Sequence, residues 1–447
     1  MLLAPPARTE PAAAGLPADP LLESLIREAL GARPELRQAQ AIVRAESERV
    51  PQAGALPDPI LSLGIQNDSF QAIEIGTAET SYYQALVTQP FFWPGKRDLR
   101  TDVASQQVKL AETQLARVGL TVEADVRRAY VELLLARDER SLLTRQETLW
   151  ELAEGLAKAR YQVGAVPQSD LLRAQLERTR LRQQRLALEA QERTRLQALN
   201  RLRDRPLDEP VETALHLADI GDPRLPGLAD ALADAEARSP ELSQARLSVQ
   251  QAKKRVELAN RERYPDMALS AGVMPRGRLD PMWTVSFSVG LPVWSGRKQE
   301  RAVAESEARH DAEGQGAEAI WQLLRLRTEE RLALLDSALE TNQLYRGGLL
   351  VQSEATTEST MSQYKVGRVS FASVLEVLNG YVADQASFLE SMARAQLIAI
   401  SQWDLSLEPS PGAAASISAG PVPGAQATGG GGAGGQPAAP SAARTGM

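Results

Sequence analysis

The chain repeats itself, and this duplication limits its possible folds more than any other feature of the sequence. Five short motifs of the first half recur in the same order in the second half, at offsets of 201 to 208 residues. The motifs are Pro34-Glu35-Leu36 with Pro240-Glu241-Leu242, Pro57-Asp58 with Pro265-Asp266, Pro90 with Pro292, Gly95-Lys96-Arg97 with Gly296-Arg297-Lys298, and Tyr161-Gln162-Val163-Gly164 with Tyr364-Lys365-Val366-Gly367. Repetition across the whole chain indicates two copies of one structural unit.

The landmarks set the expected domain boundaries. We expect a first repeat over residues 21–215 and a second over 216–407, preceded by an N-terminal extension over residues 1–20. That extension has neither a basic n-region nor an apolar h-region, so no signal peptide is visible and we expect a trimmed chain or a start upstream. Ala, Gly, Pro and Ser dominate residues 408–447, which predicts a disordered tail.

Each copy is predicted to run through the same elements. A helix over about 21–50, and again over 228–263, ends before the Pro-Asp motif because proline cannot continue a helix. Period-two alternation then predicts two strands, clearest in the second copy over 267–273 and 283–291 and weaker in the first over 61–65 and 82–88.

A long helical hairpin follows the strands in each copy. Apolar residues at three-and-four spacing predict a helix over 96–161, about 100 Å long, with a return helix over 169–203. Gly164 suits the left-handed position at the turn between them. The second copy turns at 366–370, where Ser370 is a suitable N-cap.

Composition excludes several classes of function. With 57 acidic and 50 basic residues, the net charge of -7 argues against a nucleic-acid partner. The chain has no Cys and only two His, His216 and His310, which lie far apart in sequence without the spacing of a zinc site, so neither a metal site nor a cofactor is expected. No apolar run approaches the ~18 residues of a spanning helix, so a membrane crossing would require strands.

Four strands per chain are too few to enclose a lumen, and an open sheet in lipid would leave unpaired edges. Oligomerisation would remove those edges. Strands with one apolar and one small, polar face suit a wall between lipid and water. A buried sandwich strand is the alternative interpretation of the same alternation.

The chain resembles the TolC-type outer-membrane efflux family from about residue 21 to residue 407. The resemblance is most specific in the two hairpin turns, over 161–175 and 364–378, and in the run QPFFWPGKR over 89–97. It implies a mainly α fold with a small β part, in which three chains form a twelve-stranded β-barrel above long antiparallel coiled-coil helices. It also implies a passive duct in the outer membrane of a Gram-negative bacterium, extending into the periplasm. The expected partners are two further copies, a periplasmic adaptor protein, an inner-membrane pump of the resistance-nodulation-division class and outer-membrane lipid.

The same resemblance suggests two sites. The residues that match the family's adaptor-docking tip are Val163, Gly164, Ala165, Val366, Gly367 and Arg368. Two acidic rings of the closed periplasmic end would fall at Ser373 and Glu376, with Asp170 aligned to Ser373 in the first copy. Only Glu376 can supply a carboxylate at its level, and a solvated glutamate on a helix is the alternative.

The cargo and the class of protein leave alternatives open. The QPFFWPGKR run resembles members that serve heavy-metal resistance pumps, so heavy-metal cations are a possible cargo. Three methionines near the second strand pair (Met267, Met274 and Met282) lack accompanying Cys or His and are interpreted as packing residues. A coiled-coil scaffold of the cell envelope is the main alternative, but it would not need paired strands. An enzyme is disfavoured because no catalytic constellation is evident.

Overall fold

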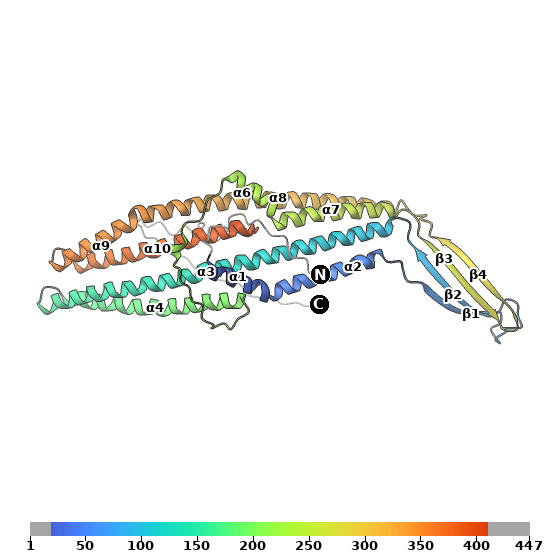
Figure 1. Cartoon of the computed structure of the whole chain (residues 1–447), viewed down its shortest axis with the longest axis horizontal. Helices are drawn as coiled ribbons and strands as arrows, with labels where there is room; N and C mark the ends of the chain where they lie inside the picture. The colour runs from blue at the N-terminus through green and yellow to red at the C-terminus, as the bar shows by residue number, and fades with distance from the viewer. Residues whose placement is uncertain (1–18, 410–447) are drawn as a thin grey trace, which may run out of the picture. The chain divides into compact units, whose positions relative to one another are not determined.

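The computed structural model describes residues 19–409, and the two halves of this range contain nearly the same series of elements (Figure 1). The first half contains α1 (Pro20–Ala32), α2 (Pro34–Gly54), β1 (Ile60–Gln66), β2 (Tyr82–Phe91), α3 (Lys96–Gln162) and α4 (Gln168–Leu202). The second half contains α5 (Leu217–Ile220), α6 (Leu228–Arg238), α7 (Pro240–Arg261), β3 (Met267–Arg276), β4 (Leu279–Val289), α8 (Gln299–Leu344), the π-helix η1 (Tyr345–Leu349), α9 (Leu350–Lys365) and α10 (Phe371–Asp404). The expected disordered tail, apart from residues 408 and 409, lies outside the described residues.

The prediction of one continuous helix before each strand pair was wrong. Each expected helix is two helices, α1 and α2 in the first copy and α6 and α7 in the second. The break falls at Arg33 and Ser239, which have extended backbones with ψ of 123° and 118°. Both residues precede a proline, and the proline ring disfavours the helical conformation of the residue before it.

The two helical hairpins have the predicted ends. At their turns, Gly164 and Gly367 have φ of +72° and +78°, a left-handed conformation that glycine adopts without a steric penalty. Ser370 caps α10 by accepting a hydrogen bond of 3.3 Å from the Ser373 amide. The second hairpin differs from the first in one respect: the π-helix η1 separates α8 from α9, whereas α3 is continuous.

The four strands form one antiparallel sheet in the order β1-β2-β3-β4. The central pair joins the two copies, because β2 belongs to the first and β3 to the second, with Ala85 opposite Val273. The sheet lies at the ends of α2, α3, α7 and α8 (Figure 1). In the part of the chain that the structure describes, β1 and β4 each have a single neighbour and are therefore open edges.

The helices pack around α3, which contacts α1, α2, α4, α7 and α10. One hydrophobic cluster joins α1, α3 and α10 and includes Leu22, Tyr130 and Ile400. A second cluster joins the two hairpins near their turns, where Trp150 of α3 packs in a group with Phe371 of α10. Among residues 19–409, none of the helices combines the length and the apolar character needed to cross a membrane.

Candidate functional site

One face of the sheet is an exposed apolar surface. Cross-strand partners share a face, so the register aligns Leu63 with Ala85, and Ala85 with Val273. Eleven large apolar residues of this face are solvent-exposed in the single chain: Leu61, Leu63, Ile65, Tyr83, Val87, Leu269, Val273, Trp283, Val285, Phe287 and Val289. Soluble monomers rarely expose a continuous apolar surface of this kind. No part of the described chain covers it, so the sandwich-strand alternative is not what the structure adopts.

The opposite face is mostly small and polar. Its hydroxyl and amide side chains are Ser62, Gln66, Gln84, Thr88, Ser270, Thr284, Ser286 and Ser288. Several of them pair across strands: Tyr82 Oη donates to Gln66 Oε1 at 2.7 Å, and the Thr88 and Ser270 hydroxyls are 2.9 Å apart. The predicted division into one apolar and one polar face is confirmed.

The sheet is tied to the helices by a junction between the two copies. Lys96 Nζ lies 2.8 Å from Asp266 Oδ1 and donates to Tyr264 O at 2.7 Å. The Trp93 amide also donates to Asp266 Oδ1, at 3.0 Å, and the Trp93 ring stacks on Tyr264 at 5.3 Å. Burial acts to raise the pKa of Asp266, but the hydrogen bonds from Lys96 and Trp93 outweigh it and hold that pKa below its usual value.

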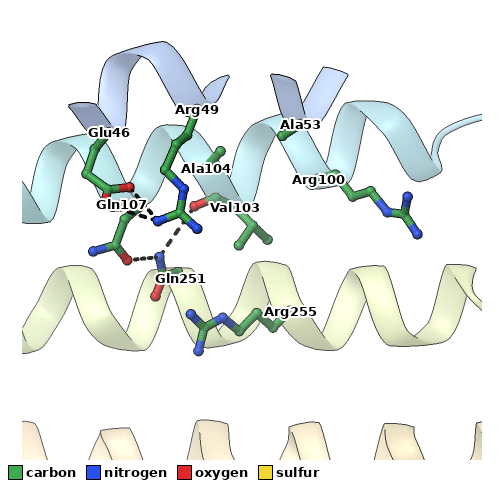
Figure 2. Close-up of a pocket in the computed structure, with 9 residues that line it drawn as sticks. All are labelled: Glu46, Arg49, Ala53, Arg100, Val103, Ala104, Gln107, Gln251 and Arg255. Atoms are coloured by element: carbon green, nitrogen blue, oxygen red, sulfur yellow. Dashed lines mark hydrogen bonds and ion pairs between the residues drawn. The ribbon is translucent and has the colours of Figure 1, made fainter. Parts of the chain in front are cut away.

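A pocket of about 240 Å³ lies beside this junction, between α2, α3 and α7 (Figure 2). Gln251 of α7 reaches across to α3, donating to Gln107 Oε1 at 2.9 Å and to Val103 O at 3.4 Å. Arg49 is paired within its own helix with Glu46, at 3.0 Å. The buried amide of Gln251 therefore fastens a helix of the second copy to a helix of the first.

The two hairpin turns lie together and present exposed valines. Val163 and Val366 have 78% and 69% of their surface exposed. Arg160 of the first hairpin donates to Tyr364 O of the second at 2.7 Å, and its guanidinium lies 4.8 Å from the centre of the Tyr364 ring. We call the segment over residues 160–170 and 364–373 the tip.

The two tip glycines differ in their surroundings. A Cβ at Gly164 would have no atom within 4 Å, whereas one at Gly367 would approach Arg160 Nη2 to 3.0 Å. Ala165 and Arg368 are exposed beside them, and their backbone amides donate hydrogen bonds to Arg160 O and Gln363 O, at 2.9 Å each, at the ends of the preceding helices. The six predicted tip residues are thus brought together, and Gly367 also packs against the contact between the hairpins.

The predicted gate residues fall at two different places. Asp170 and Ser373 occupy the same position, third in α4 and third in α10, and both are half-buried. Ser373 lies against its cap, with its hydroxyl 3.2 Å from that of Ser370. Burial raises the pKa of Tyr364, Arg160 opposes this, and the Asp170 carboxylate adds to it, so Asp170 lies near the contact between hairpins. Glu376 is exposed on α10, one turn further from the tip.

A family model decides the class of the chain. The model of the outer membrane efflux protein family matches residues 25–204 and 231–401, and so covers most of both copies. The chain belongs to the outer membrane efflux protein family. This family membership places the protein in the outer membrane of Gram-negative bacteria and agrees with a sheet whose exposed face is apolar.

Solved structures of outer-membrane efflux proteins share the fold. The chain is 17% identical to CusC, covering 90% of this chain and 99% of CusC with a TM-score of 0.75. It is 17% identical to the outer membrane protein VceC of Vibrio cholerae, covering 87% of this chain and 96% of VceC, and the TM-score is 0.71. The outer membrane channel MtrE of Neisseria gonorrhoeae also gives 17% identity and a TM-score of 0.71, over 89% of this chain and 93% of MtrE. The predicted TolC-like fold is therefore confirmed.

A curated relative matches part of the chain. Protein CyaE of Bordetella pertussis is 30% identical over 182 residues, which is 40% of this chain and 38% of CyaE. The aligned stretch thus spans less than half the length of that relative.

Two contacts at the site were missed by sequence reasoning. The sequence marked Gly95-Lys96-Arg97 and Pro265-Asp266 as landmarks of the duplication but did not pair Lys96 with Asp266. A basic residue shortly after β2 and an acidic residue directly before β3 could have predicted an ion pair, because these two strands are neighbours in the sheet. The contact of Arg160 with Tyr364 carried no such signal, because arginines are frequent along both helices.

The aromatic and basic residues of the QPFFWPGKR run have structural partners. Arg97 Nε donates to Gly54 O at 2.8 Å, and the Arg100 guanidinium, just after the run, lies 4.0 Å from the centre of the Phe92 ring. In the described residues, no three His, Asp or Glu side chains gather as a metal site would require. The run therefore joins sheet to helices, and the contacts of its residues provide no support for a particular cargo.

Proposed function

We propose that three copies of this chain form the outer-membrane duct of a tripartite efflux system, through which cargo passes without chemical change. One observation carries the proposal: a four-stranded sheet with an exposed apolar face and two open edges continues directly into long paired helices. Open edges in lipid would leave backbone groups without partners, so the strands require closure by further copies. Three chains would supply twelve strands, enough to enclose a lumen.

The alternative of a coiled-coil scaffold explains the helices but not the sheet. A scaffold in water would expose Trp283, Val285 and Phe287 to solvent at 77%, 60% and 64%. Extraction distinguishes the two proposals: the full chain should partition with outer membranes and need detergent for release. Light scattering in mild detergent should give a trimer, and release by salt washing as a monomer would contradict the duct.

The tip is the proposed docking site for a periplasmic adaptor protein. Val163 and Val366 offer small apolar side chains that are largely exposed, and glycine at the next position lets a partner backbone approach closely. Substituting the valines tests this better than substituting the glycines, because a side chain at Gly367 would strain its left-handed backbone and disturb Arg160.

The tip experiment uses Val163→Asp with Val366→Asp. We expect trimers of normal stability that lose export in cells and fail to cross-link to the adaptor. Leu186→Asp is the matched control, because Leu186 of α4 is 67% exposed but lies outside the tip. Full export by the double variant would exclude the tip as the docking site.

Glu376 is the proposed periplasmic gate. Its carboxylate is exposed, and among residues 19–409 it makes no ion pair, so it is available to face a threefold axis. Three carboxylates in one ring would attract cations and repel anions. Asp170 and Ser373 would then serve the contact between hairpins at the tip rather than the gate.

Conductance in planar bilayers tests the gate. Glu376→Gln trimers should lose cation preference and block by divalent cations, whereas the control Asp170→Asn should keep both. Unchanged behaviour of Glu376→Gln would make Glu376 an ordinary solvated residue. The cargo is a separate question: heavy-metal cations are the class that the sequence suggests, and export assays with a cognate pump and adaptor would identify it.

A further inference from the structure

The contacts that join the two repeats beside β2 and β3 are formed within the chain, whereas the equivalent residues beside the edge strands β4 and β1 lie apart. Within the chain, Trp93 and Lys96 follow a strand of the first copy and hold Asp266, which precedes a strand of the second. The duplication supplies the reciprocal set. Trp294 and the basic pair Arg297-Lys298 follow β4, and Asp58 precedes β1.

The reciprocal set has no partners in the single chain. Trp294 is 72% exposed, whereas its counterpart Trp93 is half-buried against Tyr264. Leu56, which matches Tyr264 at the spacing of the Pro-Asp motif, is exposed as well, at 43%. Over residues 19–409, neither Asp58 nor the basic pair forms any ion pair, whereas the equivalent Lys96 is 3% exposed and paired.

We propose that Asp58 of one chain binds Arg297 and Lys298 of the next chain where β4 meets β1, in the arrangement that Asp266, Trp93 and Lys96 already form between β3 and β2. This inference rests on the assembly proposed above and specifies its contact surface. A second chain is the expected partner of this surface, because the two repeats within one chain already bind each other through the same residue types. The chain cannot close the pair alone, since β1 and β4 lie on opposite edges of its sheet.

The landmarks define a register for the new pair. Pro90 corresponds to Pro292, and Asp266 corresponds to Asp58. These pairs are 202 and 208 residues apart. Ala85 and Val273 are opposite each other in the sheet, and applying the same offsets to them places Phe287 of one chain opposite Ile65 of the next. The same transfer places Val289 opposite Leu63.

The faces of the strands provide an independent check of this register. Phe287 and Ile65 both lie on the exposed apolar face, so the transferred pairing continues that face across the contact. A shift of one residue would instead set apolar side chains against serines. A shift of two residues would preserve the faces. The registers of the strand pairs β1-β2 and β3-β4 do differ by two residues: Leu61 is opposite Val87, whereas its counterpart Leu269 is opposite Phe287 rather than Val289.

Disulfide trapping tests the register directly, because the chain has no cysteine of its own. The full chain carrying Ile65→Cys and Phe287→Cys is oxidised in isolated outer membranes, and linked species are resolved on denaturing gels. Directly opposite residues have Cα atoms about 4.5–5.5 Å apart, within the range for a disulfide. A disulfide within one chain is excluded because three strand spacings of about 4.8 Å separate the two edges.

Three paired controls make the result decisive. Ile65→Cys with Val285→Cys, and with Val289→Cys, test shifts of two residues, and Ile65→Cys with Ser286→Cys tests the opposite face. The inference expects linked dimers and trimers chiefly with Phe287→Cys. Stronger linkage with Val285→Cys or Val289→Cys would overturn the register, and linkage with none of the pairs would overturn the contact between β4 and β1.

Charge exchange tests the lock separately. Asp58→Lys should weaken trimers in detergent by about tenfold or more. Combining it with Arg297→Asp and Lys298→Asp should restore them, whereas combining Asp266→Lys with the same two changes should not. Failure of the triple variant to recover would reject the lock. Export in cells is measured in parallel: register-specific linkage without export would reject the proposed function alone, and export without linkage would reject this contact alone.

Discussion

Lys96 Nζ lies 2.8 Å from Asp266 Oδ1 although the two residues belong to different copies of the duplicated unit. The lysine is almost fully buried and the carboxylate is nearly half exposed, with side-chain exposures of 4% and 46%. The buried ammonium group of Lys96 therefore pairs with a carboxylate at the surface. It fixes the direction in which the sheet leaves the helices, because Lys96 begins α3 and Asp266 directly precedes β3.

Removing this ammonium should destabilise the protein. Lys96→Met keeps the length of the side chain but leaves the Tyr264 carbonyl without its 2.7 Å donor, and we expect a loss of about 1–3 kcal/mol in the free energy of unfolding. Thermal unfolding in detergent, followed by circular dichroism, measures the change. The control Arg97→Met removes a neighbouring exposed charge and should cost less. Equal stability of Lys96→Met and the unaltered protein would show that the junction is not a stabilising contact.

His216 gives the fold a pH dependence. A 2.6 Å hydrogen bond that His216 Nδ1 makes to the Asp138 carboxylate, reinforced by the negative charge of that carboxylate, raises the pKa of His216. A raised histidine pKa contributes stability that is fully present below the unfolded value of about 6.5 and is lost as pH rises through the folded value. The melting temperature should therefore fall as the pH rises from about 6 to about 8, because His216 loses its proton over this range.

Substitution isolates the effect, because the chain has only one other histidine. His216→Gln should flatten the melting temperature over that pH range, and His310→Gln should leave the dependence intact. A dependence that persists in His216→Gln, or disappears in His310→Gln, would assign it to another group.

The sequence predicted the elements well and their contacts poorly, for physical reasons. The β3 and β4 strands were predictable because alternation is a local pattern, and Gly164 and Gly367 because a helix end needs a left-handed residue. The breaks at Arg33 and Ser239 were missed although the sequence carried their signal, since both residues precede proline. Contacts between copies were not, because Lys96 and Asp266 lie 170 residues apart and neither has a pattern of its own that selects the other.

Two glycines of the second hairpin should respond differently to substitution by alanine. Gly347 lies in the π-helix, and a Cβ there would meet no atom within 4 Å, so Gly347→Ala should stabilise by about 0.5–1 kcal/mol through helix propensity. Gly367→Ala should destabilise by about 1–2 kcal/mol, because its φ of +78° is unfavourable for alanine. Gly155→Ala, in regular α3 with equal space, is the control. Loss of stability in Gly347→Ala but not in Gly155→Ala would mean that the π-helix itself requires glycine.

A buried cluster of charges holds the end of α10. Asp404 is 1% exposed and lies 3.0 Å from Arg117 Nη1 and 2.7 Å from Arg128 Nη2. Arg331 is fully buried beside it and donates to Ser406 O and, at 3.2 Å, to Glu408 O. Burial lowers the pKa of Arg331 to about 10, and the charge of Asp404 opposes that effect. Arg117 also pairs with Glu241 at 3.1 Å and Arg128 with Asp125 at 2.9 Å, so Asp404 is the carboxylate that these two arginines share beside Arg331.

Neutralising that carboxylate should be the most damaging of the substitutions considered. Asp404→Asn preserves the shape of the side chain but removes the negative charge that Arg117, Arg128 and Arg331 share. Breaking a buried pair in this way costs about 3–5 kcal/mol, and less where the partners are part-exposed and keep other carboxylates, as Arg117 and Arg128 do. Arg331→Met removes one buried charge, and since its Nε and Nη1 have no partners in the described structure, the loss should be small. Combining the two changes should recover part of the loss, because fewer positive charges then remain unpaired. Chemical unfolding of the two single variants and the double variant measures the coupling, and additive losses would show that Asp404 and Arg331 act independently.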